Sequence, residues 1–578
     1  MSATVVVIEP PFLEPSLSRP EAWRIAAMVH ECGFEATVLD LNLALYRGLI
    51  QKEIDLVLNG LEPATVQEAF ARSFFIDPSE MERMLRGEAT PSNDLSPELR
   101  QALVGQDYKL LERLRSNAVT RFCGRQGNAT HEDYVRDQEL LNSILDINIL
   151  ALDRASHLSF SDFKCGVNPL DPTAVLDFAR DTNNVLYRLY DLTLESTTAT
   201  CASRRVLVVI SQEQQVLPGI VLARWLHRRF DARVTLTGDF LDIILSQYFT
   251  HEMFDFVEST LAYRFEYGGH PWLLEQSHPF VVTKDQREYP PFNRPALTLA
   301  GPAYTIAGTT HPRPIGPFPV ASISTTSRCY WSKCAFCVVA ANARFHFSQA
   351  SPLAMPRLLS DLELSGIFHA QFMDYALPPV LFKALAHQGG SPLRWAAQIR
   401  FEKSFVDSRL FDLAHGAGCV ALSWGFESGD PQVLHSARKG GILDPKEKEQ
   451  LLRCSSDAGI SNHLFIITGL PNETEQQFME TCRFLERNIR YIDSIEAYAF
   501  QLRPGTHCHK YPGAYGLVPT ALKWPWQSLI PYTGTPSPEL AQERARIIDE
   551  LFGQLPAASG CNDLLEGHIT LNREVMCP

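Results

Sequence analysis

The chain lacks the cysteine pattern of a disulfide-stabilised protein, although its 578 residues include 13 cysteines. Ten of them are scattered without paired spacing, which excludes a disulfide framework. Among these, Cys561 and Cys577 near the C-terminus could be redox partners, metal ligands or exposed bystanders. No basic segment opens the chain, so no signal peptide is predicted, and no apolar run reaches the roughly 20 residues of a membrane-spanning helix. These absences predict a cytoplasmic protein without membrane contacts.

An excess of positive charge is also missing. The chain has 52 lysines and arginines against 66 aspartates and glutamates, which gives a formal net charge of −14. A general nucleic-acid-binding surface requires basic charge, so nucleic acid is not predicted as a partner. The length exceeds that of a single domain and favours roughly two to four of them.

The first 40 residues predict a βαβ unit without a dinucleotide site. An apolar strand pattern from residue 4 ends at Pro10 and Pro11, a helix is predicted over 19–32, and a second strand over 35–40. This order is typical of a doubly wound, Rossmann-like sheet. No Gly-x-Gly-x-x-Gly follows the first strand, so a dinucleotide ligand is disfavoured.

The same pattern resumes after a long helical block. The block covers about 45–200, with predicted helices at 66–74, 97–114, 132–153 and 172–192, the last interrupted by the polar run from Asp181. Strands are then predicted at 205–210, 233–237 and 254–258, with a helix over 218–230. Ligands of such sheets bind outside the carboxyl ends of the strands. Those ends carry Pro11, Ser211, Thr237 and Gly238.

A proline-rich linker over 286–320 leads to three closely spaced cysteines, Cys329-Tyr-Trp-Ser-Lys-Cys334-Ala-Phe-Cys337. Three thiolates on one loop can bind three irons of a cubane cluster and leave the fourth iron open. A structural zinc site is an alternative, with His346 as the fourth ligand. Buried cysteines without any metal are another, because cysteine behaves as a small hydrophobe.

Strands and helices alternate after this loop. Strands are predicted at 368–374, 393–400, 419–427 and 460–468, with helices at 352–364, 408–417 and 446–458 between them. This alternation predicts βα units and a parallel sheet. In barrels of this kind the chemistry lies at the carboxyl ends of the strands, where Asp374, Arg400, Glu427 and Gly469 fall. Taken singly, the acids could be helix caps and the arginine a surface ion pair.

Taken in order, these motifs resemble the radical S-adenosylmethionine (SAM) superfamily. The Cys-x-Phe-Cys ending, the Gly-x-Glu-Ser-Gly turn at Glu427 and the Gly-Leu-Pro-x-Glu-Thr turn at Gly469 carry the resemblance. The usual superfamily loop has three residues between its first two cysteines, whereas this one has four. The resemblance implies a 4Fe–4S cluster on Cys329, Cys334 and Cys337. It assigns SAM binding to Phe336, Asp374 (amino group), Arg400 (carboxylate), Glu427 (ribose), Thr468 and Gly469 (adenine).

The N-terminal part resembles the cobalamin-binding domain that precedes many radical SAM cores. The Pro-Pro turn and the later strand that ends near glycine carry this resemblance, although the Asp-x-His-x-x-Gly motif of other cobalamin proteins is absent. It implies cobalamin at Pro11, Ser211, Thr237 and Gly238. The expected α/β architecture is a Rossmann-like cobalamin-binding domain over 1–285 with its helical insertion, a partial (β/α)6 TIM-type radical SAM barrel over 321–515, and a small C-terminal extension over 516–578.

The resemblance also implies a reaction. A 5′-deoxyadenosyl radical would abstract hydrogen from an unactivated carbon, and methylcobalamin would supply a methyl group to a peptide or other natural-product substrate. A flavodoxin- or ferredoxin-like protein would donate the electron. Radical rearrangement, epimerisation or cyclisation without methyl transfer is the alternative within this class. A zinc-binding interaction module is the alternative of another class.

Overall fold

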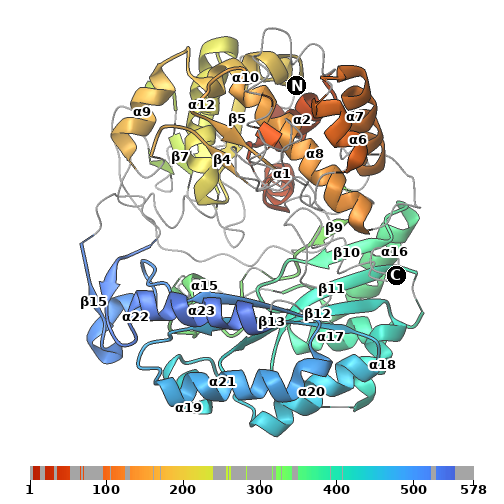
Figure 1. Ribbon diagram of the computed structural model, residues 1–578, viewed down its shortest axis with the longest axis vertical. Coiled ribbons are helices and arrows are strands. Elements are labelled where there is room, and N and C mark those ends of the chain that lie inside the picture. Colours follow the sequence, from red (N-terminus) through yellow and green to blue (C-terminus); the bar gives the residue numbers. More distant parts are fainter. Residues whose placement is uncertain are drawn as a thin grey trace.

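The chain folds around two six-stranded sheets (Figure 1). The computed structural model describes residues 4–12, 20–31, 35–52, 66, 69–70, 96–104, 106–123, 131–160, 162–168, 171–202, 204–238, 255–257, 259–261, 281–282, 315–316, 320–326, 328–341, 349–390, 392–406, 408–521 and 529–552. The first sheet and its helices fill the upper half of Figure 1, and the second sheet fills the lower half. The predicted α/β class is confirmed.

The first sheet has the order β2-β1-β5-β6-β7-β8. Its strands are β1 (Thr4–Glu9), β2 (Glu35–Asp40), β5 (Arg205–Val209), β6 (Arg233–Thr237), β7 (Ser259–Leu261) and β8 (Val281–Val282). All neighbours are parallel except β7 and β8. The chain reverses its direction of winding between β1 and β5, and ligands of doubly wound sheets bind at such a switch point.

Alternate residues of β1 face opposite layers, which is why the strand is an uninterrupted apolar run. Val5 and Val7 pack with helix α1 (Pro20–Glu31), whereas Val6 and Ile8 pack into a larger core with helix α12 (Val216–Phe230). The predicted strand at 254–258 is wrong in position. Residues 255–257 form a turn, and the strand begins at Ser259.

The helical block predicted as an insertion packs into this larger core. Its described elements are α2 (Leu41–Ile50), α6 (Pro97–Val104), α7 (Tyr108–Cys123), α8 (His131–Leu150), the hairpin β3 (His157–Leu158) and β4 (Phe163–Lys164), α9 (Pro172–Arg180), α10 (Val185–Thr193) and α11 (Glu195–Thr198). The helix predicted over 172–192 breaks after Arg180, because the Asn184 side chain caps a new helix by accepting from Tyr187 N. The helix predicted over 97–114 breaks near Gln106, whose φ is +48°. The helix predicted over 66–74 lies mostly outside the described residues.

The second sheet is parallel throughout, and its strands follow one another in chain order. They are β9 (Ala321–Ile323), β10 (His369–Phe372), β11 (Arg394–Arg400), β12 (Cys419–Glu427), β13 (Ser461–Thr468) and β14 (Ser494–Ala499). The accompanying helices are α15 (Val338–Ala341), α16 (Met355–Leu364), α17 (Pro379–Ala386), α18 (Ser408–Gly416), α19 (Pro431–Ser436), α20 (Pro445–Asp457) and α21 (Glu475–Asn488). This is the strand order predicted for a partial (β/α)6 barrel, in which all strand ends meet at one edge.

One helix of the segment predicted as a C-terminal extension packs into this second core. Its helix α23 (Pro538–Phe552) packs against β13 and β14, and Ile548 and Phe552 are buried in the core of the second sheet. The short elements α22 (His507–Lys510), β15 (Val518–Pro519) and β16 (Tyr532–Thr533) precede it. The last residues, with Cys561 and Cys577, lie outside the described part of the chain.

Two further observations bear on the sequence predictions. Ile315, inside the predicted linker, is fully buried in the core of the first sheet, and Gly316 N donates to Phe122 O at 2.8 Å. Most of the linker lies outside the described residues. Within the part of the chain that the structure describes, no helix is long and apolar enough to cross a membrane.

Candidate functional site

The cysteine loop starts at the carboxyl end of β9 and is anchored by Asp374, which follows β10. The Asp374 carboxylate is 2% exposed and accepts four hydrogen bonds, from the backbone N–H and hydroxyl groups of Thr325 and Thr326, at 2.6–2.9 Å. Four donors satisfy both of its oxygens. In this structure Asp374 therefore positions the chain that leads into the cysteines, and its predicted contact with the SAM amino group stays a prediction.

Two aromatic side chains hold the loop to neighbouring strand ends. The Tyr330 hydroxyl donates to Glu402 at 2.7 Å, and the Trp331 indole N–H donates to Arg438 O at 3.0 Å. The Trp331 ring lies against Gly440, where an added Cβ would come within 1.8 Å of the indole. Ser332 adopts a left-handed backbone with φ +45°. We infer that this turn and the docked indole accommodate the residue by which the loop exceeds the usual superfamily spacing.

The three cysteines are half-buried, and they do not form a site for a single ion. No three His, Cys, Asp or Glu side chains among the described residues are arranged to hold one metal ion. Zinc requires sulfurs about 2.3 Å from a common ion, and the fourth ligand of the zinc hypothesis, His346, lies outside the described residues, so the zinc alternative stays untested. In a cubane cluster each sulfur binds a different iron, which calls for more widely spaced sulfurs. The cluster on Cys329, Cys334 and Cys337 stays a prediction.

Positive charge surrounds the central thiol of the loop. Burial raises the pKa of Cys334 to about 11, while the nearby Lys439 and Arg400 act to lower it. Arg400 is buried, and the Lys439 side chain is 12% exposed. A cluster bound by three thiolates carries negative charge, so its binding is favoured by cations placed here.

Arg400, the last residue of β11, has an unsatisfied buried nitrogen. Its side chain is 4% exposed, its Nη2 donates to Lys439 O and to Gly440 O, and its Nε lies 3.4 Å from Glu402. Its Nη1 has no hydrogen-bond partner. A buried guanidinium nitrogen without an acceptor is costly, and a carboxylate is the group that best matches it. The residue therefore fits the SAM carboxylate that the sequence resemblance assigns to it.

Glu427 ends β12 in a left-handed conformation with φ +58°, beside an irregularity in the pairing of β12 with β13. Its carboxylate is 7% exposed and accepts from the Lys439 ammonium. Burial would lower the pKa of Lys439, but the Glu427 carboxylate outweighs this and the pKa is raised. Glu427 thus holds the segment that also binds Arg400 and Trp331; its ribose contact stays a prediction.

Lys448 on α20 is a second buried cation behind this turn. It is 2% exposed, it donates to Ser428 O at 3.1 Å, and its ammonium lies 4.6 Å from the centre of the Phe426 ring. Burial, together with the neighbouring charge of Lys439, lowers the pKa of Lys448 to about 7. The lysine is therefore only partly protonated at neutral pH.

This burial predicts a pH-dependent stability. The folded-state pKa of Lys448 lies below its ordinary value of 10.5, so above about pH 7 the unfolded chain binds more protons than the folded one, and stability rises with pH up to about 10.5. The gain is at most about 1.4 kcal/mol per pH unit. Lys448→Met removes it, so the unfolding temperature of wild type minus that of the variant should rise between pH 7 and 9. Lys446→Met, exposed on the same helix, should leave this pH dependence unchanged, and parallel profiles for wild type and Lys448→Met would contradict the prediction.

Thr468 and Gly469, predicted to contact adenine, are packed against α23. The Thr468 hydroxyl donates to Ala541 O at 2.7 Å, and a Cβ added to Gly469 would lie 2.2 Å from the Ala541 Cβ. Gly469 N donates to Glu473 at 2.8 Å. The helix therefore fixes the turn after β13, and the predicted adenine contact stays a prediction.

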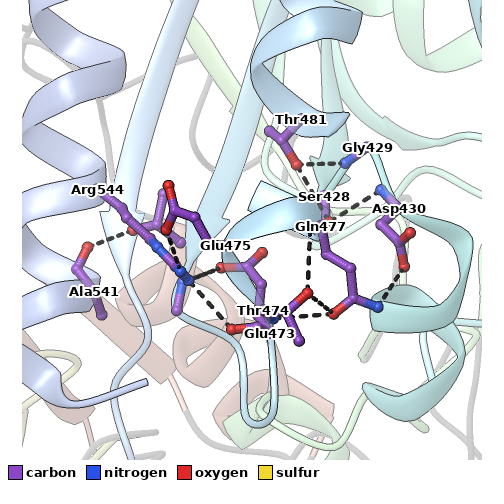
Figure 2. A network of polar contacts seen from close by, with 12 residues as sticks. Ser428, Gly429, Asp430, Glu473, Thr474, Glu475, Gln477, Thr481, Ala541 and Arg544 are labelled. Carbon is purple, nitrogen blue, oxygen red and sulfur yellow. Dashed lines mark hydrogen bonds and ion pairs between the residues drawn. The ribbon is translucent and has the colours of Figure 1, made fainter. Parts of the chain in front are cut away.

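Figure 2 shows the polar network that connects this turn with its neighbours. Arg544 of α23 donates to Glu473 at 3.0 Å and to Glu475 at 2.8 Å, and its side chain is 3% exposed. Burial raises the pKa of Glu473 to about 7, against the lowering effects of Gly469 N–H and Arg544. On the other side, the Thr481 hydroxyl of α21 accepts from Gly429 N at 2.8 Å. The spacing of Gly469 and Glu473 is visible in the sequence as Gly-x-x-x-Glu. Nothing in the sequence predicts that Glu473 would pair with Arg544.

Phe336, the aromatic residue inside the Cys-x-Phe-Cys ending, is partly buried. It packs against an apolar cluster beside the barrel sheet that includes Val433, Leu470, Phe500 and Leu502. Its predicted contact with SAM stays a prediction, because in this structure the ring's observed role is to seat the end of the loop on that cluster.

The four residues predicted for cobalamin lie at the carboxyl ends of three adjacent strands of the first sheet, β1, β5 and β6. The hydroxyl groups of Ser211 and Thr237 are buried and have no hydrogen-bond partner. Gly238 has φ +128°, and a Cβ there would come within 2.2 Å of Ile210 O, so this position requires glycine. Pro11 follows β1, which lies on the other side of the switch point from β5 and β6. Two unsatisfied hydroxyls at this edge fit a polar ligand.

Gln215 is a residue of this edge that sequence reasoning missed. Its buried carboxamide donates to Glu9 at 2.9 Å and to Pro10 O at 3.0 Å, and it accepts from Ser211 N at 2.9 Å. It thereby joins the loop after β1 to the loop after β5 across the switch point. The run Gln212-Glu-Gln-Gln marks a polar loop in the sequence, but which glutamine is buried depends on the packing of the two strands.

No protein-family model and no curated protein matches the chain. Among solved structures, TsrM from Kitasatospora setae, a radical SAM methyltransferase with cobalamin and a [4Fe-4S] cluster bound, aligns at 12% identity over 90% of this chain and 78% of that chain, with a TM-score of 0.49. TsrM with tryptophan substrate and the SAM analogue aza-SAM aligns at 13% identity over 90% and 79%, with a TM-score of 0.46. The cobalamin-dependent SAM radical enzyme OxsB with aqua-cobalamin aligns at 12% identity over 87% and 82%, with a TM-score of 0.44.

Proposed function

We propose that this protein is a cobalamin-dependent radical SAM enzyme that methylates an unactivated carbon of a peptide or another natural product. The observation that carries the proposal is the unsatisfied Nη1 of buried Arg400, which stands next to a docked loop of three cysteines at the carboxyl end of a parallel sheet. An anion site and a set of thiols in one place match the carboxylate of SAM and an iron–sulfur cluster. The surrounding cations, Lys439 and Arg400, offset the charge of three thiolates.

The residues fit the proposed cofactors in two places. Cys329, Cys334 and Cys337 would hold the cluster, and Arg400 would hold SAM. At the first sheet, Ser211 and Thr237 would donate to cobalamin, and the Gln215 carboxamide keeps the two loops of the switch point together. When bound, the cluster and SAM supply a carbon-centred radical, and cobalamin supplies a methyl carrier. In this proposal residues 1–285 form the cobalamin-binding part, and the barrel extends from 321 through α23.

The chain's own contribution is orientation and the exclusion of water. Arg400 fixes one end of SAM, and the bonds of Glu427 to Lys439 and of Trp331 to Arg438 O close the segment beside the loop. The ring of Trp331 packs on Gly440 beside the loop. A dry site limits side reactions of a radical.

None of the ten described cysteines forms a disulfide, which supports a reducing cytoplasm as the site of action.

Anaerobic reconstitution followed by product analysis tests the proposal. We expect about four irons with labile sulfide per chain, bound cobalamin, and a product heavier than the substrate by one methylene. An unchanged product mass would replace methylation by rearrangement, epimerisation or cyclisation. A colourless protein that retains zinc and takes up no iron would refute the proposal and favour the zinc-binding interaction module.

A further inference from the structure

Acidic residues are absent from the segments that meet at the cysteine loop. Asp and Glu make up 66 of the 578 residues, yet none occurs in the 72 residues 289–360, which contain the loop. None occurs in the 42 residues 497–538 or in the 13 residues 431–443. In a chain with a net charge of −14, three such runs are a strong local bias in charge.

The tertiary structure brings these three segments together. Ala335 N, inside the cysteine loop, donates to Ala437 O at 2.8 Å, and Cys508 N donates to Ala335 O at 3.0 Å. The loop is therefore bonded directly to 431–443 on one side and to 497–538 on the other. Three segments far apart in the sequence therefore meet at the cysteine loop, and none of them contains an acidic residue.

Three exposed cations lie on this region: Lys333 from the loop, Arg438 after α19, and Lys510 at the end of α22. The Lys333 ammonium lies 4.9 Å from the ring of Trp331, whose indole N–H donates to Arg438 O. Burial lowers the pKa of His507, and the neighbouring Arg438 and Lys510 lower it further. The three cations thus form one surface, and none of them makes an ion pair with any residue that the structure describes.

Two acids that contact the loop or Lys439 are themselves already paired. Glu402 lies beside Arg400 and accepts from Tyr330, and Glu427 is buried and bonded to Lys439. A net charge of −14 repels an acidic protein on average, and a local surface of cations offsets this repulsion. Charge complementarity of this kind sets the orientation and the rate of encounter more than the final affinity.

We propose that Lys333, Arg438 and Lys510 form the docking surface for an acidic one-electron carrier protein that reduces the cluster. This inference rests on the proposed function. One electron passes from the reduced carrier to the cluster, so the carrier is oxidised by one electron as the cluster is reduced by one. Lys333 adjoins Cys334, so a carrier bound here is brought to the cysteines themselves. Transient complexes between redox proteins are small, about 1,200 Å² or less, and a surface of three cations suits that size.

The test compares two triple variants of the full chain with an acidic flavodoxin as the probe. Lys333→Gln/Arg438→Gln/Lys510→Gln removes the surface, and Lys109→Gln/Arg113→Gln/Lys383→Gln removes the same charges from exposed positions on α7 and α17. Binding is measured by anaerobic calorimetry at low ionic strength. We expect the first variant to bind the flavodoxin roughly tenfold more weakly than wild type, the second to bind it within about twofold, and high salt to abolish the difference.

A second measurement separates docking from the cluster itself. Stopped-flow reduction of the reconstituted protein should slow roughly tenfold with flavodoxin hydroquinone in the first variant and stay unchanged with dithionite, at equal iron content. Equal flavodoxin binding by both variants would overturn the proposal, as would slower reduction by dithionite together with unchanged binding, since the cations would then serve only the cluster's charge. Calorimetry requires no cluster, so failure to reconstitute one would refute the proposed function without affecting the binding result.

Discussion

Gly440→Ala is expected to prevent assembly of the proposed iron–sulfur cluster as completely as Cys334→Ala would. Gly440 has φ +64°, and a Cβ there would lie 1.8 Å from the Trp331 indole. The left-handed backbone alone costs an alanine about 1–2 kcal/mol, and the overlap adds about 1–3 kcal/mol. The ring must leave its seat, and the loop loses its contact beside the cysteines. Iron and sulfide per chain after anaerobic reconstitution measure the effect.

Gly441→Ala is the matched control for this experiment. Gly441 has almost the same backbone, with φ +59°, but the nearest atom to an added Cβ is the Glu402 Cγ at 3.4 Å. Gly441→Ala has the same strain of a left-handed backbone but no steric overlap with the Trp331 indole. We therefore expect this variant to retain most of its iron. Circular dichroism confirms that both variants fold. Full iron occupancy in Gly440→Ala would show that the docked indole does not hold the loop.

Arg544→Met should produce the second large effect, a loss of about 3–5 kcal/mol of stability. The substitution leaves the Glu473 carboxylate buried at 2% exposure without its cation. Because the folded-state pKa of Glu473 lies above its ordinary value of 4.5 and would rise further in the variant, the folded protein binds more protons than the unfolded one. As the pH rises from 6 to 8, the free energy of unfolding of the variant should therefore fall more steeply than that of wild type. Urea unfolding followed by circular dichroism measures both effects.

Arg546→Met, two residues along the same helix, is the control. Its guanidinium is half exposed and pairs with Glu543 and Glu550 at the surface, and such pairs contribute about 0–1 kcal/mol. The double variant Arg544→Met/Glu473→Gln should recover part of the loss, because it removes the buried charge. Equal stabilities of Arg544→Met and Arg546→Met would show that α23 is not fastened to the turn by this ion pair.

Periodicity in the sequence was sufficient for most elements of both sheets. The predicted strands at 35–40 and 233–237 coincide with β2 and β6, and the predicted strand at 419–427 coincides with β12. Strands buried on both faces give continuous apolar runs, which is a strong signal. Sequence analysis did not predict strand β14 or helices α17 and α21 as elements of the barrel. Half-exposed strands and short or highly charged helices give only a weak periodicity signal.

Local pattern could not show which charges would be paired. The place of Asp374 after a strand predicts a ligand-binding carboxylate. It does not predict that this carboxylate accepts hydrogen bonds from Thr325 and Thr326, which lie 49 and 48 residues away in sequence. Arg544 joins Glu473 across 71 residues. These contacts depend on how helices pack onto the sheet, and no spacing within a segment encodes that packing.

By itself the sequence determined the two α/β parts, the cysteine loop and the strand ends at which Arg400 and Glu427 stand, because strand and turn signals are local. The tertiary structure decided the rest. It determined that α23 belongs to the second core, that Trp331 docks on Gly440, that Arg400 keeps an unsatisfied nitrogen, and that three acid-free segments surround the cysteines. The physical reason is that burial, steric contact and electrostatic field arise between segments that only folding brings together.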